Sequence, residues 1–315
     1  MPTVPFPILR LPNAILQRSL QQMSPIGLIS LSVLSNNMKQ IVTMPNNKSR
    51  FDGRISTTLP ITLHLNVDRN SRHHYVEYAF QFNQSVLRIQ DIRGQEPATL
   101  TKPGFTDKLW IEHVAEVLFQ NKGVILSCDA PFRTYIKELL KNINVTLIAI
   151  RSSGFEVWKF FELFPSLEKV TFTEGPIPLS VLSRNLDGLK VNTKDVPLDD
   201  ALTSNSLSFA MHRNSFTMKE INLFIKQWIR GCNPRLEMFQ ILFNDIERHL
   251  VLENVIFKGI NYIEKRNRIV QCQEREEYRI ERFDGTEALV WFNPNRFPFL
   301  EMTVMMNDDD DKLLV

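Results

Sequence analysis

A six-residue pattern of apolar positions, apolar-x-x-apolar-x-apolar, recurs through the second half of this 315-residue chain. The central apolar positions of the first four copies are about 22, 19 and 18 residues apart, and the last copy follows after about 32. Such a period is typical of a protein built from repeated strand-containing units. The copies are Val145/Ile148/Ile150, Leu167/Val170/Phe172, Leu186/Leu189/Val191, an imperfect Leu207/Phe209, and Leu236/Phe239/Ile241.

Short helices are predicted between these strands. The best-marked one covers residues 218–230, because Thr217 and Glu220 have capping-box spacing and Gly231 with Pro234 ends the helix. Strands that alternate with short helices run parallel, with the helices stacked on one side. A doubly wound sheet would need longer crossovers, so the pattern favours a leucine-rich-repeat-like α/β solenoid. The other predicted helices cover residues 155–164, 178–184 and 198–203.

The chain before the repeats has a different period. Apolar residues alternate strictly over residues 61–67 and 76–82, and a third strand is predicted near 87–89. Helical spacing returns at residues 110–118 and 132–143. Residues 45–54 are polar and irregular, and we interpret them as a linker.

Three features are predicted after the repeats. Asp284-Gly285 lies between alternating apolar residues of 280–292, which predicts a hairpin. Glutamates 274, 276 and 277 lie among arginines and are interpreted as a solvated charged stretch. Residues 301–315, with four consecutive aspartates, are expected to form an acidic tail.

The charge and cysteine content exclude several classes of function. The formal net charge is +2, from 37 Lys and Arg against 35 Asp and Glu, which gives no support for a nucleic-acid partner. Three widely spaced cysteines fit a reducing compartment better than a disulfide framework. The longest early apolar stretch, residues 26–34, is too short to cross a membrane, and residues 1–7 lack the features of a signal peptide. We expect a cytoplasmic or nuclear protein with no membrane partner.

Catalytic patterns are also missing from the sequence. The cysteines have no metal-binding spacing, His73-His74 has no spaced partner, and Asp308–Asp311 lies in the acidic tail. The sequence contains no nucleophile elbow, phosphate loop or dinucleotide-binding fingerprint. We therefore predict no catalytic residue, no metal site and no cofactor.

The first part of the chain, residues 8–44, is predicted to form three short helices. Leu11-Pro12 ends an extended entry, and Ser24-Pro25 supplies an N-cap with proline at the first helical position. About forty residues in three helices do not bury this much apolar surface alone. Some of these side chains must contact a neighbouring module or another protein.

This segment resembles an F-box. The matching features are Leu11-Pro12, Ile15 and Leu16, Met23, Leu28 with Leu31-Ser32, and Lys39 before Ile41-Val42. The tryptophan common in the third F-box helix is missing, and Met38 lies near its expected place.

Residues 177–243 show a second resemblance, to the type 2 F-box-associated domain, a module expanded in nematodes. The two resemblances together cover about a third of the chain, in the order F-box first. The matching residues are Val181-Leu182-x-x-Asn185-Leu186, Leu198-Asp199-Asp200-Ala201-Leu202, and Asn222-Leu223-Phe224-Ile225-Lys226-x-Trp228-Ile229-x-Gly231-x-Asn233-Pro234-x-Leu236.

The resemblance implies the substrate-recognition subunit of a Skp–cullin–F-box E3 ubiquitin ligase, which docks on a Skp-type adaptor and through it on cullin. It would bind an unidentified protein target and contribute no catalytic group. We expect an F-box at 5–46, a strand-rich connecting region at 47–120, a leucine-rich-repeat-like module with parallel strands and a C-terminal hairpin at 121–300, and the acidic tail. The alternative is a non-catalytic protein-binding repeat module without ubiquitin-ligase coupling.

Two sets of binding residues follow from this interpretation. Trp228 and the Gly231–Pro234 segment are excluded from both, because a helix stripe and a helix stop are structural. The predicted adaptor-binding residues are Leu11, Pro12, Ile15, Leu16, Met23, Leu28, Leu31, Met38 and Ile41. The predicted target-binding residues, on the exposed positions of the repeat strands, are Lys169, Thr171, Lys190, Asn192, Ser208 and Gln240.

Overall fold

The computed structural model divides the chain into two compact units, Met1–Leu147 and Ile148–Val315, which are described separately. It is a mixed α/β structure whose sheet includes parallel strands, as predicted. The residues that it describes are 11–43, 51–57, 61–68, 75–91, 97–119, 122–129, 134–151, 157–193, 196–214, 216–243, 253–270, 273–293 and 299–305.

Unit 1 begins with the three predicted helices, α1 (Asn13–Gln22), α2 (Pro25–Ser32) and α3 (Asn36–Val42). The Ser24 hydroxyl accepts a hydrogen bond from the Gly27 amide at 3.2 Å, and Pro25 is the first helical residue. The Ser35 hydroxyl caps α3 in the same way, by accepting from the Met38 amide at 3.2 Å. These caps satisfy amides that no helical carbonyl reaches, so each short helix has a defined start.

A mostly antiparallel sheet follows in unit 1, with the strand order β6-β1-β2-β3-β4-β5. The pair β1–β6 is parallel, and the other pairs are antiparallel. The predicted strands near residues 61–67, 76–82 and 87–89 are therefore confirmed. The strands are β1 (Phe51–Ser56), β2 (Thr62–Asp68), β3 (Tyr75–Asn83), β4 (Val86–Asp91), β5 (Ala98–Thr101) and β6 (Val124–Cys128).

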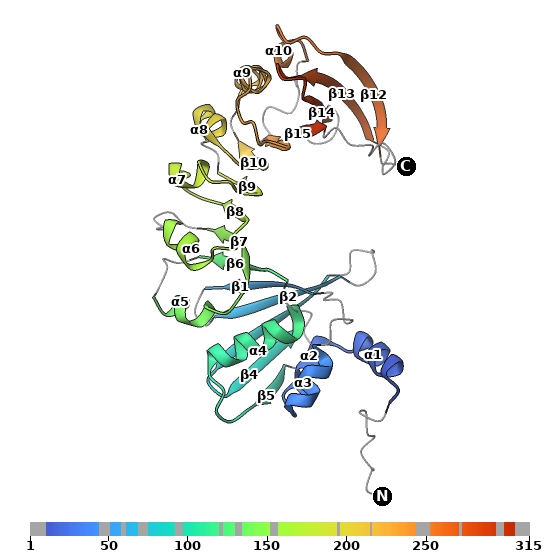
Figure 1. Cartoon of the computed structure of the whole chain (residues 1–315), viewed down its shortest axis with the longest axis vertical. Coiled ribbons are helices and arrows are strands. Elements are labelled where there is room, and N and C mark those ends of the chain that lie inside the picture. The colour runs from blue at the N-terminus through green and yellow to red at the C-terminus, as the bar shows by residue number, and fades with distance from the viewer. Residues whose placement is uncertain are drawn as a thin grey trace, which may run out of the picture. The chain divides into compact units, whose positions relative to one another are not determined.

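Helix α4 (Asp107–Phe119) packs on this sheet, against β1 and β3, and α5 (Thr134–Leu140) packs beside α4 (Figure 1). The ring of Phe119 lies over Gly53, where any side chain would collide with it. Part of the predicted linker is thus wrong, because residues 51–54 belong to β1. The glycine hid the strand, since it fills a buried position of the alternating pattern without an apolar side chain.

Unit 2 contains the repeats. The strands β8 (Lys169–Phe172), β9 (Gly188–Val191), β10 (Ser208–Asn214) and β11 (Met238–Phe243) pair in parallel. The helices lie on one side of these strands (Figure 1). They are α6 (Val157–Leu163), α7 (Leu179–Leu182), α8 (Leu198–Thr203) and α9 (Met218–Ile229), and the strand β7 (Val145–Ile150) precedes them.

The sequence pattern reappears as a row of side chains across the repeat strands. Val170 lies opposite Leu189, Leu189 opposite Phe209, and Phe209 opposite Phe239. All four side chains are buried, and the Phe239 ring stacks on Phe224 of α9 at 3.9 Å between centroids. The apolar repeat therefore forms the core between strands and helices.

The parallel run stops at β11, which pairs antiparallel with β15. Beyond β15, the strands β14, β13 and β12 continue the sheet in this order, and each pairs antiparallel with its neighbour. The confirmed β13–β14 hairpin is therefore part of a four-stranded antiparallel segment. The elements are the helix α10 (Glu253–Ile256) and the strands β12 (Glu264–Val270), β13 (Gln273–Glu281), β14 (Glu287–Asn293) and β15 (Phe299–Met305).

The interpretation of residues 274–277 as a solvated stretch is wrong, because they lie within β13. Glu277 is buried, and the hydroxyl of buried Tyr278 donates to the Glu276 carboxylate at 2.8 Å. Pairing on both sides, with β12 and β14, gives this charged segment its strand geometry. A sequence pattern dominated by charge does not reveal such pairing.

Candidate protein-interaction sites

The predicted adaptor-binding residues divide by their exposure. Pro12, the N-cap of α1, and Ile15 within α1 are exposed, and 53% of Ile15 is accessible. Leu11, Met23, Leu31 and Ile41 are half-buried. The buried ones are Leu16, Leu28 and Met38.

Helices α2 and α3 face the rest of unit 1, which explains this division. The hydroxyl of Ser32 and Nε2 of His113 on α4 lie 2.8 Å apart, both buried, and Lys39 forms an ion pair with Glu116 at 2.5 Å. The hydroxyl hydrogen of Ser32 is donated to the Ile29 carbonyl at 2.7 Å, so Nε2 of His113 is the nitrogen that donates to Ser32. Part of the apolar surface is thus covered within the chain, and the exposed part lies mainly on α1.

The environment of His113 favours its neutral form. Burial, together with the nearby charges of Lys39 and Lys102, lowers the pKa of His113 to about 4. The neutral imidazole is therefore the form that joins α2 to α4 at physiological pH. Its ring also meets Phe105 and Trp110 edge-on.

Leu34 is a further exposed apolar residue of this segment, with 72% of its side chain accessible. It is not among the predicted adaptor-binding residues. It lies two residues after the end of α2. The apolar positions of that helix cover more than one face, so periodicity did not distinguish inner from outer residues.

The predicted target-binding residues share one face of the repeat strands. Thr171 lies opposite Lys190, and the next residues along the same row are Ala210 and Gln240. Lys169 begins the neighbouring row, and its stem passes over Gly188. These positions alternate with the buried ones, so they lie on the side away from the helices. Asn192 directly follows β9, and Ser208 begins β10.

The same row continues into the antiparallel strands, and the sequence pattern did not predict this continuation. Gln240 lies opposite Glu301, and its amide donates to the Glu301 carboxylate at 2.6 Å. Trp291 lies opposite Glu301 on the other side, and its indole N–H donates to that carboxylate at 3.1 Å. The guanidinium of Arg275 lies 3.9 Å from the Trp291 ring. The face therefore extends beyond the repeats to an ordered polar and aromatic cluster.

Trp228 of α9 and the Gly231–Pro234 segment that follows the helix have a structural role, as predicted. Trp228 is fully buried. Asn233 has a positive φ of 51°, and its buried amide donates to the Ala201 carbonyl at 3.0 Å and to the Ser204 carbonyl at 2.7 Å. The motif thus ties the loop after α9 to the end of α8.

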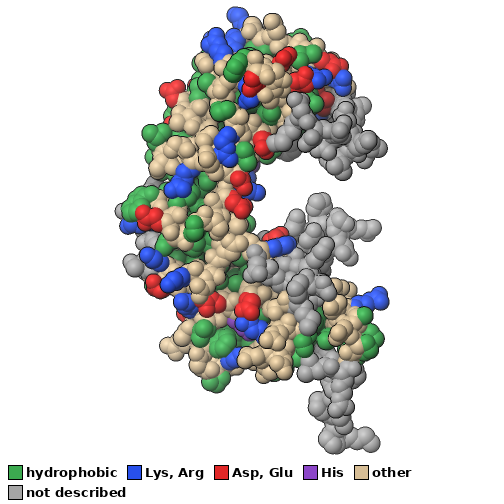
Figure 2. Space-filling view, in the orientation of Figure 1, with side chains coloured by type: hydrophobic (Ala, Val, Ile, Leu, Met, Phe, Trp, Pro, Cys, Tyr) green, Lys and Arg blue, Asp and Glu red, His purple; other side chains and the backbone are tan. Residues whose placement is uncertain are grey.

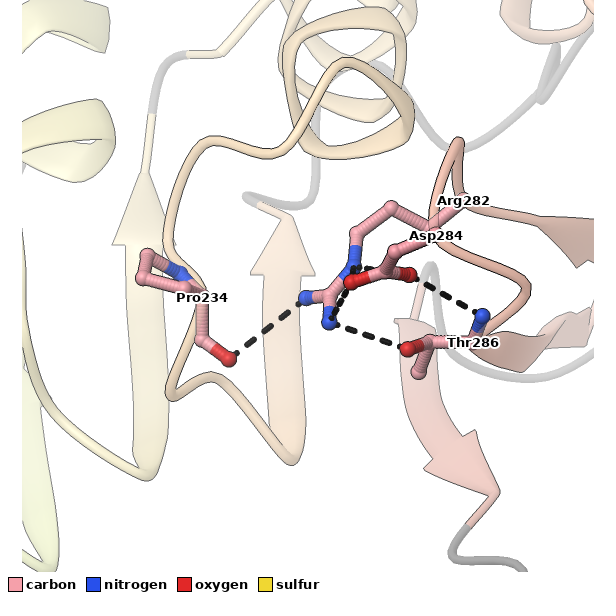
Figure 3. Close-up of polar contacts among 4 residues, drawn as sticks. All are labelled: Pro234, Arg282, Asp284 and Thr286. Carbon is pink, nitrogen blue, oxygen red and sulfur yellow. Dashed lines mark hydrogen bonds and ion pairs between the residues drawn. The ribbon is translucent and has the colours of Figure 1, made fainter.

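Arg282 connects this loop with the β13–β14 hairpin (Figure 3). Its guanidinium donates to the Asp284 carboxylate at 2.7 Å, to the Thr286 hydroxyl at 3.0 Å and to the Pro234 carbonyl at 3.5 Å. The bonds from Arg282 and Thr286 hold the pKa of Asp284 well below its usual range. These contacts join the end of the repeats to the C-terminal strands.

Other kinds of site have little support among the described residues. Within those ranges, no group of three or more His, Cys, Asp or Glu side chains is placed to hold a metal ion. No helix in the described part of the chain has the length and apolar character to span a membrane. Burial, with the nearby Asp129 charge, raises the pKa of Cys128 to about 12, so its thiol stays protonated. His73-His74, Cys272 and Asp308–Asp311 lie outside the described residues.

The surface charge is mixed. Lys and Arg side chains are interspersed with Asp and Glu side chains on the face of each unit that Figure 2 shows.

Comparisons with known proteins match both the N-terminal helices and the repeat strands. The family model of the F-box domain matches residues 8–50, and a model described as F-box associated matches residues 177–241. A relative from Caenorhabditis elegans, "F-box associated domain-containing protein sdz-33", is 37% identical over 309 residues, which cover 96% of this chain and 99% of the relative. No solved structure matches the chain.

Proposed function

Because this chain belongs to the family of F-box proteins that carry an F-box-associated domain, we propose that it is the substrate-recognition subunit of a Skp–cullin–F-box E3 ubiquitin ligase. In this family the F-box binds a Skp-type adaptor and the associated domain binds a substrate, and such domains are typical of non-catalytic subunits. One observation carries the proposal. The F-box precedes the F-box-associated domain in a chain that is related over almost its full length to a protein of this family. The chain would raise the local concentration of target lysines near the conjugating enzyme, without a catalytic residue or cofactor of its own.

The exposed apolar residues of the F-box support the docking step. Pro12 at the N-cap of α1 and Ile15 within it are exposed, and Leu11, Met23, Leu31 and Ile41 keep part of their surface accessible. Full burial of one such side chain contributes roughly 1.5–3 kcal/mol. Several of them together would offset the cost of association and give a stable adaptor complex. Leu16, Leu28 and Met38 would act indirectly, by holding the helices in place.

The open face of the repeat strands is the proposed site for a protein target. It carries Lys169 and Lys190 at one end and the Gln240–Glu301–Trp291 cluster at the other. Repeat proteins bind partners along such extended faces. We interpret the ladder from β8 to β11, with a helix after each of the first three strands, as the centre of a leucine-rich-repeat-like module at 121–300. A cytoplasmic or nuclear location would suit this role.

Affinity purification of the tagged full-length chain tests the proposal. The adaptor and cullin should co-purify with the wild type, and the double variant Leu11→Ala/Pro12→Ala should lose both. Candidate targets should remain bound to this variant and should accumulate on the wild type when the proteasome is inhibited. Unchanged adaptor recovery with the double variant would contradict the docking proposal.

A protein-binding module without ligase coupling remains the second candidate, and one observation favours it. The contacts Ser32–His113 and Lys39–Glu116 attach the F-box helices to α4. In that case the F-box helices would complete the fold of unit 1 and need no partner. The same purification distinguishes the two candidates, because only the first predicts adaptor and cullin.

A further inference from the structure

Unit 2 contains a cleft that neither domain match assigns to a function. It has a volume of about 540 Å³ and lies between the C-terminal half of α9, the segment that follows α10 and the end of β13. We call it the α9–β13 cleft. Its lining includes Lys226, Ile229, Arg230, Tyr262, Ile263 and Phe283.

The cleft gathers exposed apolar side chains. The exposed fractions of Tyr262, Ile263 and Phe283 are 42%, 54% and 75%. Isolated exposed apolar residues are common on protein surfaces, but a contiguous group of them marks an interaction site. These three side chains, with half-buried Ile229, give the cleft an apolar wall.

Backbone and ring contacts hold this wall in place before any ligand binds. The Phe283 amide donates to the Ile229 carbonyl at 2.9 Å, and the Phe283 ring lies over Gly231, whose φ is 98°. The Ile263 amide donates to the Arg279 carbonyl at 2.7 Å. The Tyr262 ring packs edge-on against Tyr278 at 5.3 Å. A preformed wall lowers the ordering cost of binding.

The cleft is also lined by cationic side chains. Lys226 and Arg230 lie one turn apart on α9 and its C-cap, and neither forms an ion pair with any described residue. Arg282 is already paired with Asp284, and Glu281 is the acidic residue of the lining. Asn222 fixes this side of α9 by donating to the carbonyls of Ile256 and Lys258, at 2.6 and 3.0 Å. Two available cations therefore line the same cleft as the apolar wall.

We propose that the α9–β13 cleft binds a short acidic peptide that carries an aliphatic or aromatic anchor next to its carboxylates. The carboxylates would pair with Lys226 and Arg230, and the anchor would pack against Ile263 and Phe283. Charge complementarity selects this occupant, because a purely apolar peptide would leave both cations without a partner. The inference rests on the proposed function for the source of the peptide, a target protein, but the binding itself requires neither adaptor nor cullin.

Fluorescence anisotropy with the purified full-length chain tests this proposal. The probe is a fluorescein-labelled peptide in which three aspartates precede a Leu-Leu pair. We expect a Kd on the order of tens of micromolar, as for a short peptide in a small cleft, and weaker binding at higher ionic strength. Replacing the aspartates of the probe with asparagine, or its leucines with serine, should weaken binding by about tenfold or more.

The chain offers matched variants. Lys226→Glu and Arg230→Glu should each weaken probe binding by about tenfold or more, because each replaces an attraction by a repulsion. Lys219→Glu, on the same helix two turns earlier and outside the cleft, should leave the affinity within about twofold. Phe283→Ala tests the apolar wall, and Ile263→Ser tests it independently if Phe283→Ala affects folding.

Several outcomes would overturn the proposal. These are no detectable binding, equal binding by Lys219→Glu and the cleft variants, or self-association of the chain that the cleft variants abolish, which would assign the cleft to a second copy. Binding that appears only after aspartates 308–311 are changed to asparagine would assign it to the chain's own C-terminal segment. Adaptor binding, measured on the same preparations, should be unaffected by the cleft variants, so a failure here is distinguishable from a failure of the proposed ligase function.

Discussion

Individual residues in and around the motif of Trp228 and the Gly231–Pro234 segment hold distant segments of the chain together. Asn233 reaches the end of α8, Arg282 reaches the Pro234 carbonyl, and Trp228 fills the core beneath them. Sequence reasoning identified the motif as a helix stop, since Gly231 and Pro234 have that meaning in any chain. The carbonyl partners of Asn233 and the Pro234 carbonyl that Arg282 reaches lie 29 to 48 residues away and were not predictable from spacing.

Asn233→Ala should lower the free energy of unfolding by about 2–3 kcal/mol, because two buried carbonyls lose their donor. Asn233→Gly should also destabilise, although glycine readily adopts the positive φ of this position. Asn254→Ala, at an exposed position, is the control. Urea unfolding followed by circular dichroism measures the differences, and wild-type stability of Asn233→Gly would show that backbone conformation alone accounts for this residue.

His113 should make the stability of unit 1 sensitive to acid. Its pKa is about 4 in the folded chain and near 6.5 when unfolded, so the unfolded state binds the additional proton. The stabilising effect of the neutral ring is complete above pH 6.5 and is lost as the pH falls toward 4. Between pH 7 and pH 5 we expect a loss on the order of 2 kcal/mol.

The variant His113→Gln keeps a polar side chain but does not titrate, so its stability should depend less on pH than that of the wild type. Thermal unfolding of both proteins across this pH range measures the difference. Identical pH profiles would rule out His113 as the source.

At the scale of elements, the repeat helices and strands were the most predictable part. Each repeat strand has an apolar pattern in its sequence and a predicted helix next to it. The central apolar residues of these patterns, from Val170 to Phe239, lie opposite one another in neighbouring strands and form the buried row. The strand β1 was hidden by Gly53, and β13 by its charges. Both depend on pairing with distant strands, which a local pattern does not encode.

The capping box of α9 gives an element-scale prediction. The Thr217 hydroxyl accepts from the Glu220 amide at 3.3 Å, and the Glu220 carboxylate accepts from the Thr217 amide at 2.8 Å. Thr217→Ala should cost about 1 kcal/mol of stability, while Thr217→Ser, which keeps the hydroxyl, should cost little. Equal denaturant midpoints for the two variants would contradict the capping account.

At the scale of the whole molecule, the sequence predicted which two modules are present and in which order. It did not predict which apolar residues of the F-box are covered by the chain itself. That division depends on α4, whose residues lie about 80 positions from α2, as the Ser32–His113 bond shows. Nor did it predict that the open face continues from Gln240 to Glu301 and Trp291, because the antiparallel strands join the repeats through non-local pairing.

Calorimetric titration of the full-length chain with a purified Skp-type adaptor tests the docking proposal most directly, with Ile15→Asp as the variant and Leu179→Asp as the control. Ile15 and Leu179 are both exposed helical residues, but Leu179 lies on α7 in unit 2. We predict submicromolar binding by the wild type and the control, and a loss of about a hundredfold or more in Ile15→Asp, which places a charge in an apolar interface. Absence of adaptor binding by the wild type, or full affinity of Ile15→Asp, would contradict the account.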